Sequence, residues 1–102
     1  MSTIDDWRQK IDDVDKELVR LLNERASYAN EIGKIKEKAG LDAYTPKREE
    51  EVVQNVLQWN TGPLEPDALR RLFERIIDES RRLERMAMAE RHSSSQSSGE
   101  KK

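Results

Sequence analysis

The chain has 102 residues, of which 39% are charged, 34% hydrophobic and 5% aromatic, and its formal net charge is −2. This length suits one domain with a modest core, and the balanced charge excludes a general attraction to nucleic acid. The sequence has no cysteine, which excludes disulfides, thiolate catalysis and cysteine-based metal sites.

The sequence shows neither a targeting signal nor a membrane span. Its first ten residues, MSTIDDWRQK, contain no apolar h-region, and no apolar run approaches the length that a bilayer requires. The single histidine, His92, lies near the C-terminal end and provides neither a metal cluster nor the base of a catalytic triad. We therefore expect a cytoplasmic protein that binds no metal, membrane or nucleic acid.

The first predicted element is a long amphipathic helix from Thr3 to about Lys38. Its apolar residues recur at steps of three and four, the spacing of one face of an α-helix. These residues are Ile4, Trp7, Ile11, Val14, Leu18, Leu21, Tyr28, Ile32, Ile35 and Ala39. Ser2 or Thr3 is expected to cap the start of the helix, and Gly40 to close its end. Such a rod is about 54 Å long, whereas a compact domain of this size has a radius of gyration of about 13 Å, so we expect a second protomer to cover the apolar face.

A loop and a shorter helix follow. Residues 40–45 are predicted to form the loop, and Pro46 is well placed in the first turn of a second helix capped by Thr45. This helix is expected to run to about Trp59, where the sequence NTGP at 60–63 ends it.

A third helix is predicted from Pro66 to about Arg91. The last ten residues, SSSQSSGEKK, are expected to be disordered because they have no apolar surface to bury. The sequence thus predicts an all-α fold of three helices, with a helical domain over residues 1–92 and a disordered polar tail over residues 93–102.

Several polar residues occupy helical faces that are otherwise apolar. They are Arg25, Glu49, Ser80, Glu84 and, less regularly, Lys36. Each of them alone is explained by an interhelical ion pair or by a side chain that reaches solvent. Together, on three helices, they indicate a buried pocket for a small, doubly anionic ligand, because arginine binds carboxylates through two parallel hydrogen bonds.

Two further arginines are candidates for this pocket. Arg48 lies at the start of the second helix, near the end of the first, and is able to face the same space. Arg8 lies about 25 Å from Arg25 along the first helix, so one small ligand cannot touch both in a single rod. Arg8 is therefore expected to reach a pocket only across an antiparallel dimer.

The sequence resembles the all-helical chorismate mutase family over about residues 4–88. The resemblance rests on the segments WRQKIDDVDKELVRLLNER, GKIK, PKREEEV and IIDESRRLE. It implies a monofunctional, stand-alone isomerase that forms an intertwined helical homodimer with two equivalent, shared active sites. The implied reaction is the Claisen rearrangement of chorismate to prephenate in aromatic amino-acid biosynthesis, with no cofactor and no covalent intermediate.

The resemblance also implies roles for the candidate residues. Arg25, with Arg8 from the partner protomer, would grip the two substrate carboxylates and select the compact reactive conformer, which lowers the entropic part of the barrier. Lys36 and Glu84 would stabilise the negative charge that develops on the ether oxygen.

The remaining substrate contacts come from the second and third helices. The resemblance places Arg48 and Glu49 near the substrate hydroxyl and gives Ser80 a polar contact with the substrate. This chain departs from the family pattern at two positions: Glu84 stands where many members have glutamine, and Thr45 where many have aspartate. The second departure leaves the hydroxyl contact open.

Other functions remain possible on the sequence alone. A related lyase removes pyruvate from isochorismate in a similar pocket, and the sequence separates the two activities poorly. A non-enzymatic helical dimerisation module would use the same apolar face, and an enzyme of this kind that also docks onto another enzyme of the pathway is a third alternative.

Overall fold

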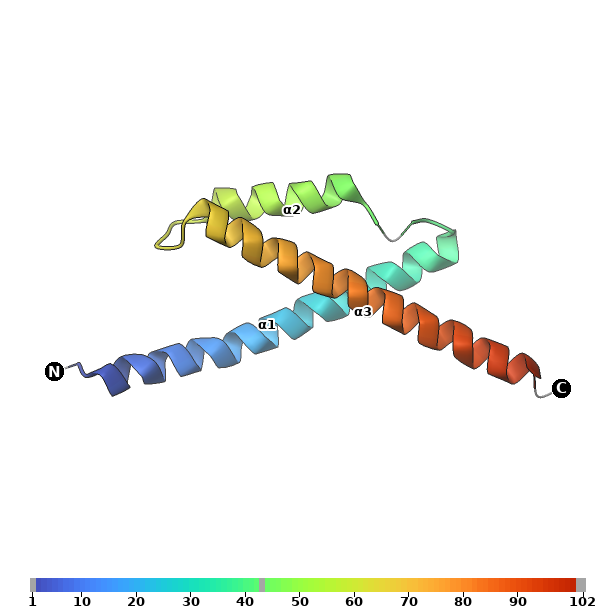
Figure 1. Ribbon diagram of the computed structural model, residues 1–102, viewed down its shortest axis with the longest axis horizontal. Helices are drawn as coiled ribbons and strands as arrows, with labels where there is room; N and C mark the ends of the chain where they lie inside the picture. The colour runs from blue at the N-terminus through green and yellow to red at the C-terminus, as the bar shows by residue number, and fades with distance from the viewer. Residues whose placement is uncertain (1, 43, 101–102) are drawn as a thin grey trace.

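The computed structural model of the protein describes residues 2–42 and 44–100, with side chains as far as residue 93. This part of the chain consists of three helices without strands: α1 (Ile4–Ala39), α2 (Pro46–Trp59) and α3 (Pro66–Glu100) (Figure 1). The predicted all-α, three-helix fold is therefore confirmed.

Both ends of α1 have the predicted capping residues. The Thr3 hydroxyl accepts a hydrogen bond from the Asp6 backbone N–H at 3.1 Å, and the Asp6 carboxylate accepts one from the Thr3 N–H at 3.0 Å. This reciprocal capping box satisfies two backbone donors. Gly40 adopts the left-handed conformation with φ 69°, and the Leu41 N–H donates to the Lys36 carbonyl at 2.8 Å.

The bounds of α2 follow the prediction, whereas those of α3 do so only at its start. α2 begins with Pro46 and ends at Trp59. Residue 43 of the predicted loop lies outside the described residues. α3 begins at Pro66 but continues to Glu100, so the end predicted near Arg91 is wrong.

The extension of α3 has a local explanation. No proline and no glycine interrupts the sequence between Arg91 and Gly99, so the backbone hydrogen bonds can continue although the segment has no apolar face. The helix thus continues over residues 93–100 of the predicted tail, and residues 101–102 lie outside the described part. The division into a helical domain over residues 1–92 and a disordered polar tail over residues 93–102 stays a prediction.

The helices form an elongated molecule in which α3 packs against both other helices. In Figure 1, α1 and α3 cross near the middle of the molecule, α2 lies along the first half of α3, and the two termini lie at opposite ends. The molecule measures 71 × 31 × 16 Å and has a radius of gyration of 18.6 Å. That radius exceeds the roughly 13 Å of a compact 100-residue domain.

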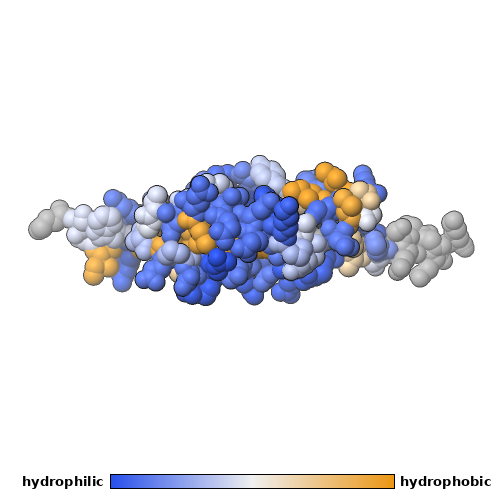
Figure 2. Space-filling model, turned by 90° about the horizontal axis from the view of Figure 1, so that it is seen from above, coloured by the Kyte–Doolittle hydropathy of each residue, from blue (hydrophilic) through white to orange (hydrophobic). Residues whose placement is uncertain are grey.

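The core is small, and α1 takes no part in it. Among the described residues, the buried hydrophobic side chains are Val53, Val56 and Ile77, where α2 packs on α3. The predicted apolar face of α1 stays solvent-accessible along its length, from 70% exposed at Ile4 to 45% at Leu21. The face of the molecule shown in Figure 2 is largely hydrophilic, with separate hydrophobic patches.

The contacts of α1 with α3 are made largely by small and polar residues, among them Arg25 of the predicted apolar face, which donates a hydrogen bond to Ser80. Gly33 lies against Glu84, and Glu37 binds the Arg91 side chain. Small and polar residues at this crossing let the two helices approach closely, while the large apolar side chains of α1 stay exposed. None of the described helices is long and apolar enough to cross a membrane.

Candidate functional site

A pocket of about 260 Å³ lies between the second half of α1, the start of α2 and the middle of α3. All the predicted site residues except Arg8 line this pocket: Arg25, Lys36, Arg48, Glu49, Ser80 and Glu84. Ala29, Ile32, Val52 and Ile77 give it an apolar floor. Residues from all three helices thus converge, as the polar positions on apolar faces predicted.

Arg8 lies outside the pocket of its own chain. Its side chain is 72% exposed and forms an ion pair with Asp5 at 3.6 Å, near the start of α1. Exposed pairs of this kind contribute little to stability. Arg8 is therefore available to another molecule that packs against the first turns of α1.

Arg25 is a half-buried cation with a weak partner in the pocket. Its Nη1 donates a hydrogen bond to the Ser80 hydroxyl at 3.4 Å. Burial lowers the pKa of Arg25, and the nearby charge of Arg48 lowers it further. Within the described part of the chain, no carboxylate pairs with Arg25. A half-buried guanidinium beside a second guanidinium is stabilised by an anion bound between them.

Lys36 and Thr45 connect the end of α1 to the start of α2. The Lys36 Nζ donates to the Thr45 hydroxyl at 2.7 Å, and both residues line the pocket. Thr45 occupies the N-cap position of α2, but its side chain makes no capping hydrogen bond. The threonine that departs from the family pattern thus helps to hold the site lysine.

Glu84 projects from α3 toward the close approach of α1. A Cβ atom added to Gly33 would lie 3.3 Å from the Glu84 Cγ, so the missing side chain of Gly33 makes room for this carboxyl. Burial raises the pKa of Glu84, while the charges of Lys36 and Arg81 oppose that shift. The protonated form of Glu84 is thereby favoured more than for an exposed glutamate.

Sequence reasoning missed Arg81 as a pocket residue. It lines the pocket, and its Nε lies 3.1 Å from the Glu49 carboxylate. Its guanidinium also lies over the Tyr44 ring, 4.7 Å from the ring centre. The signal was present, because Arg81 follows the buried Ile77 by four residues and so shares its face of α3.

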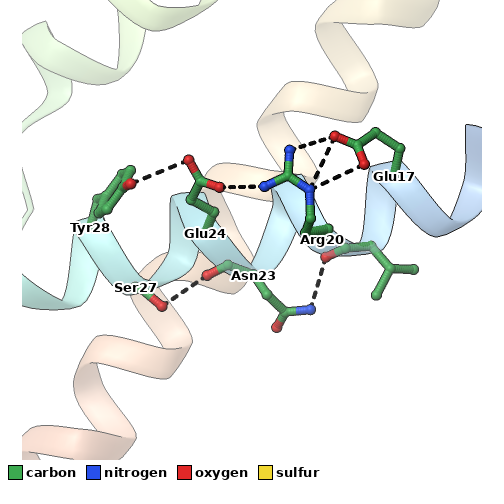
Figure 3. Close-up of polar contacts among 7 residues, drawn as sticks. Glu17, Arg20, Asn23, Glu24, Ser27 and Tyr28 are labelled. Carbon is green, nitrogen blue, oxygen red and sulfur yellow. Dashed lines mark hydrogen bonds and ion pairs between the residues drawn. The ribbon is translucent and has the colours of Figure 1, made fainter.

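Tyr28 is a second pocket residue whose role sequence reasoning missed, because it was taken only as part of the apolar face. Its hydroxyl donates to Glu24 at 3.2 Å, and Glu24 accepts a hydrogen bond from Arg20 at 2.8 Å. Figure 3 shows these contacts as part of a polar ladder along α1 that also includes Glu17. The ladder orients Tyr28 at the edge of the pocket.

The chemistry of the lining defines the class of ligand. Its cationic side chains are Arg25, Lys36, Arg48 and Arg81, and they outnumber the carboxylates of Glu49 and Glu84. Among the described residues, no group of three or more acidic or histidine side chains is arranged to hold a metal ion. The fold and the pocket therefore define an all-α protein with a binding site for a small anionic molecule.

Comparison with known proteins places this site in a family. The sequence profile of chorismate mutase type II matches residues 7–85. The chain is 38% identical over 89 residues to a bifunctional chorismate mutase/prephenate dehydratase of Aquifex aeolicus, and 40% identical over 78 residues to one of Neisseria gonorrhoeae. These matches cover 83% and 76% of this chain but only 25% and 21% of the relatives.

A solved structure supports the same assignment. The structure of chorismate mutase (form II) from Thermus thermophilus superposes with a TM-score of 0.79 at 39% identity, and the match covers 80% of this chain and 93% of that one. The chain belongs to the chorismate mutase type II family, and the resemblance found in the sequence is confirmed.

Proposed function

We propose that this protein is a chorismate mutase, which converts chorismate to prephenate in the synthesis of phenylalanine and tyrosine. The observation that carries the proposal is Arg25, a half-buried guanidinium that feels the charge of Arg48 and lacks a carboxylate partner in the described part of the chain. Chorismate carries two carboxylates, and one of them would supply the missing anion. The family assignment supports the same substrate.

The proposed mechanism needs no nucleophile. Arg25 holds one carboxylate and fixes the substrate in its compact chair, so that the bond-forming carbons are close before the reaction begins. As the C–O bond breaks, the ether oxygen gains negative charge, and the ammonium of Lys36 stabilises it. A protonated Glu84 donates a second hydrogen bond to the same oxygen.

The other pocket residues bind the rest of the substrate. Arg48 and Glu49 lie at the start of α2, where they can address the ring hydroxyl, and Ser80 supports Arg25 through its hydrogen bond. Thr45 is engaged with Lys36, so we assign the hydroxyl contact to Glu49 rather than to position 45.

The active form is proposed to be an antiparallel homodimer in which the partner supplies Arg8. Two properties of α1 support this arrangement: its apolar face is exposed in the single chain, and Arg8 lies on the exposed end of the same helix. Burying this face against its copy would remove a long apolar stripe from water. Sedimentation at micromolar concentration is expected to give a dimer, and a folded monomer would remove the role assigned to Arg8.

A substrate comparison tests the proposed activity. Purified protein is supplied with chorismate and, separately, with isochorismate, and the loss of each substrate and the release of pyruvate are followed. We expect chorismate to disappear without pyruvate release. Pyruvate release from isochorismate, with chorismate unchanged, would assign the pocket to the lyase reaction instead. Loss of neither substrate would favour a non-enzymatic dimerisation module.

A further inference from the structure

Arg81 connects α3 to α2 and to the segment between α1 and α2. It extends from α3, its Nε lies 3.1 Å from the Glu49 carboxylate on α2, and its guanidinium covers the ring of Tyr44 in the connection before α2. A third contact, from Nη2 to Asp78 at 2.7 Å, ties the guanidinium to its own helix. Both side chains of the Arg81–Glu49 pair are about a quarter exposed, so water screens the pair only in part.

The charge of Glu49 is unfavourable for the proposed ligand. Glu49 lines the same pocket as Arg25 and Arg48, and an unpaired carboxylate there would repel a substrate that carries two carboxylates of its own. Arg48 pairs with Glu51 at 3.3 Å rather than with Glu49. Among the described residues, Arg81 is the cation paired with Glu49.

We propose that Arg81 is a positioning residue of the active site, which neutralises and orients Glu49 so that the pocket accepts a dianionic substrate while Glu49 remains able to bind the substrate hydroxyl. The inference rests on the proposed function. The two guanidinium groups then have different roles: Arg25 binds the substrate directly, whereas Arg81 acts through Glu49.

The Nε of Arg81 supports this assignment. It is buried, and although it lies within ion-pair distance of Glu49, its N–H makes no directed hydrogen bond. Buried donors are usually satisfied. The Nε–H of Arg81 is therefore available to donate a hydrogen bond to the Glu49 carboxylate once a bound substrate hydroxyl has oriented that carboxylate.

Steady-state kinetics with chorismate test the proposal in the whole 102-residue chain. Arg81→Met removes the guanidinium but keeps much of its length, and Arg75→Met is the matched control. Arg75 lies on the same helix, is 75% exposed and pairs only with neighbouring Glu79 at 3.2 Å among the described contacts. We expect Arg81→Met to raise KM about tenfold with kcat changed less than about threefold, and Arg75→Met to change neither.

The decisive variant is the double substitution Arg81→Met with Glu49→Gln. If Arg81 serves to neutralise Glu49, removal of the Glu49 charge reverses much of the increase in KM that Arg81→Met causes. If the role of Arg81 is purely structural, KM should not fall in the double variant, because Glu49→Gln then weakens substrate binding further. A double variant with a KM equal to or above that of Arg81→Met overturns the proposal.

Further controls distinguish a failure of the Arg81 proposal from misfolding and from a failure of the proposed function. Circular dichroism checks each variant, and if Arg81→Met does not fold, Arg81→Gln replaces it with the same expected and contradicting outcomes. Unchanged KM in Arg81 variants of an active enzyme overturns only the role of Arg81. A folded wild-type dimer that leaves chorismate unchanged refutes the proposed function itself.

Discussion

Arg25 occupies a position that is unfavourable for the protein without its ligand. Burial and the neighbouring Arg48 both lower its pKa, and its hydrogen-bond partner is the neutral Ser80. A residue kept for stability alone would have a carboxylate partner or an apolar replacement. In the proposed function, a bound substrate carboxylate offsets this cost, which is the pattern expected of a binding residue.

Substitution of Arg25 or Lys36 by alanine is expected to lower activity far more than stability. Loss of one preorganised charge in such a site reduces kcat/KM on the order of 10²–10³-fold. Lys34→Ala is the matched control, because Lys34 lies on the same helix, pairs with Glu31 at 3.1 Å and does not line the pocket. Steady-state kinetics and thermal melts decide the point. Near-normal turnover in Arg25→Ala would show that Arg25 has a structural role and does not bind the substrate.

Glu84 is expected to make activity depend on pH. Its pKa is raised, chiefly by burial, although Lys36 and Arg81 pull it downward. Only the protonated carboxyl donates a hydrogen bond to the ether oxygen, so the productive form exists below the raised pKa and is lost as pH rises through it. Turnover should therefore fall toward alkaline pH, and Glu84→Gln should flatten the pH–rate profile. Two profiles of the same shape would show that Glu84 is not the titrating donor.

Single residues were predicted from the sequence where they broke a periodic pattern. Arg25, Ser80 and Glu84 stood out because each interrupts an apolar stripe. Arg81 did not, since the sequence cannot show that its partner Glu49 lies across the helix interface. Whether Arg8 reaches a neighbouring pocket depends on a second chain, which neither periodicity nor a single protomer supplies.

At the level of whole elements, the helix starts were well predicted because local chemistry fixes them. Thr3, Pro46 and Pro66 each mark a start through side-chain capping or a preset φ. The end of α3 was mispredicted because it was inferred from the loss of an apolar face. No proline or glycine lies between Arg91 and Gly99, so nothing in the sequence stops the helix at the predicted residue.

We expect the glycine at position 33 to favour the activity of the site at a cost to the stability of α1. Alanine at a helix-interior glycine stabilises a helix by about 1 kcal/mol, but here the new Cβ would crowd the Glu84 Cγ at 3.3 Å. Gly33→Ala should therefore raise or keep the melting temperature while lowering kcat/KM severalfold.

Ser27→Ala is the control for this substitution. Ser27 is exposed on α1, and its hydroxyl bonds the Asn23 carbonyl of its own helix, so alanine there changes helix propensity without adding atoms near Glu84. Full activity in Gly33→Ala would show that Glu84 has room to move, and that the close approach of α1 and α3 does not position it.

At the scale of the whole molecule, the single chain is too elongated to bury its own apolar surface. Its radius of gyration is 18.6 Å, and α1 has no buried residue. The length of the predicted first helix already indicated an elongated chain, since a helix of about 54 Å is longer than a compact domain of this size.

A shared active site predicts complementation between inactive variants. Arg8→Ala and Arg25→Ala are each expected to be nearly inactive. When the two are unfolded and refolded together, each mixed dimer regains one intact pocket, so activity should return to about a quarter of the wild-type value. No recovery above the separate variants would contradict the crossing of Arg8 between protomers.

The polar tail is expected to be dispensable. Deletion of residues 93–102 leaves Arg91 and His92, whose side chains bind Glu37 on α1, and removes a segment without apolar residues. The melting temperature and kcat/KM should both stay unchanged. A marked fall in either would show that the last turns of α3 contact the active dimer.

The conversion of chorismate to prephenate by the purified wild-type protein tests the central claim most directly. The assay follows the ultraviolet absorbance of chorismate and then identifies the product. The Arg25→Ala variant serves as the inactive control. We expect chorismate to be lost with stoichiometric formation of prephenate and without an added cofactor. The rate should be at least about a hundredfold lower in Arg25→Ala, on the order expected for loss of one preorganised charge. A folded, dimeric wild-type protein that leaves chorismate unchanged would contradict it.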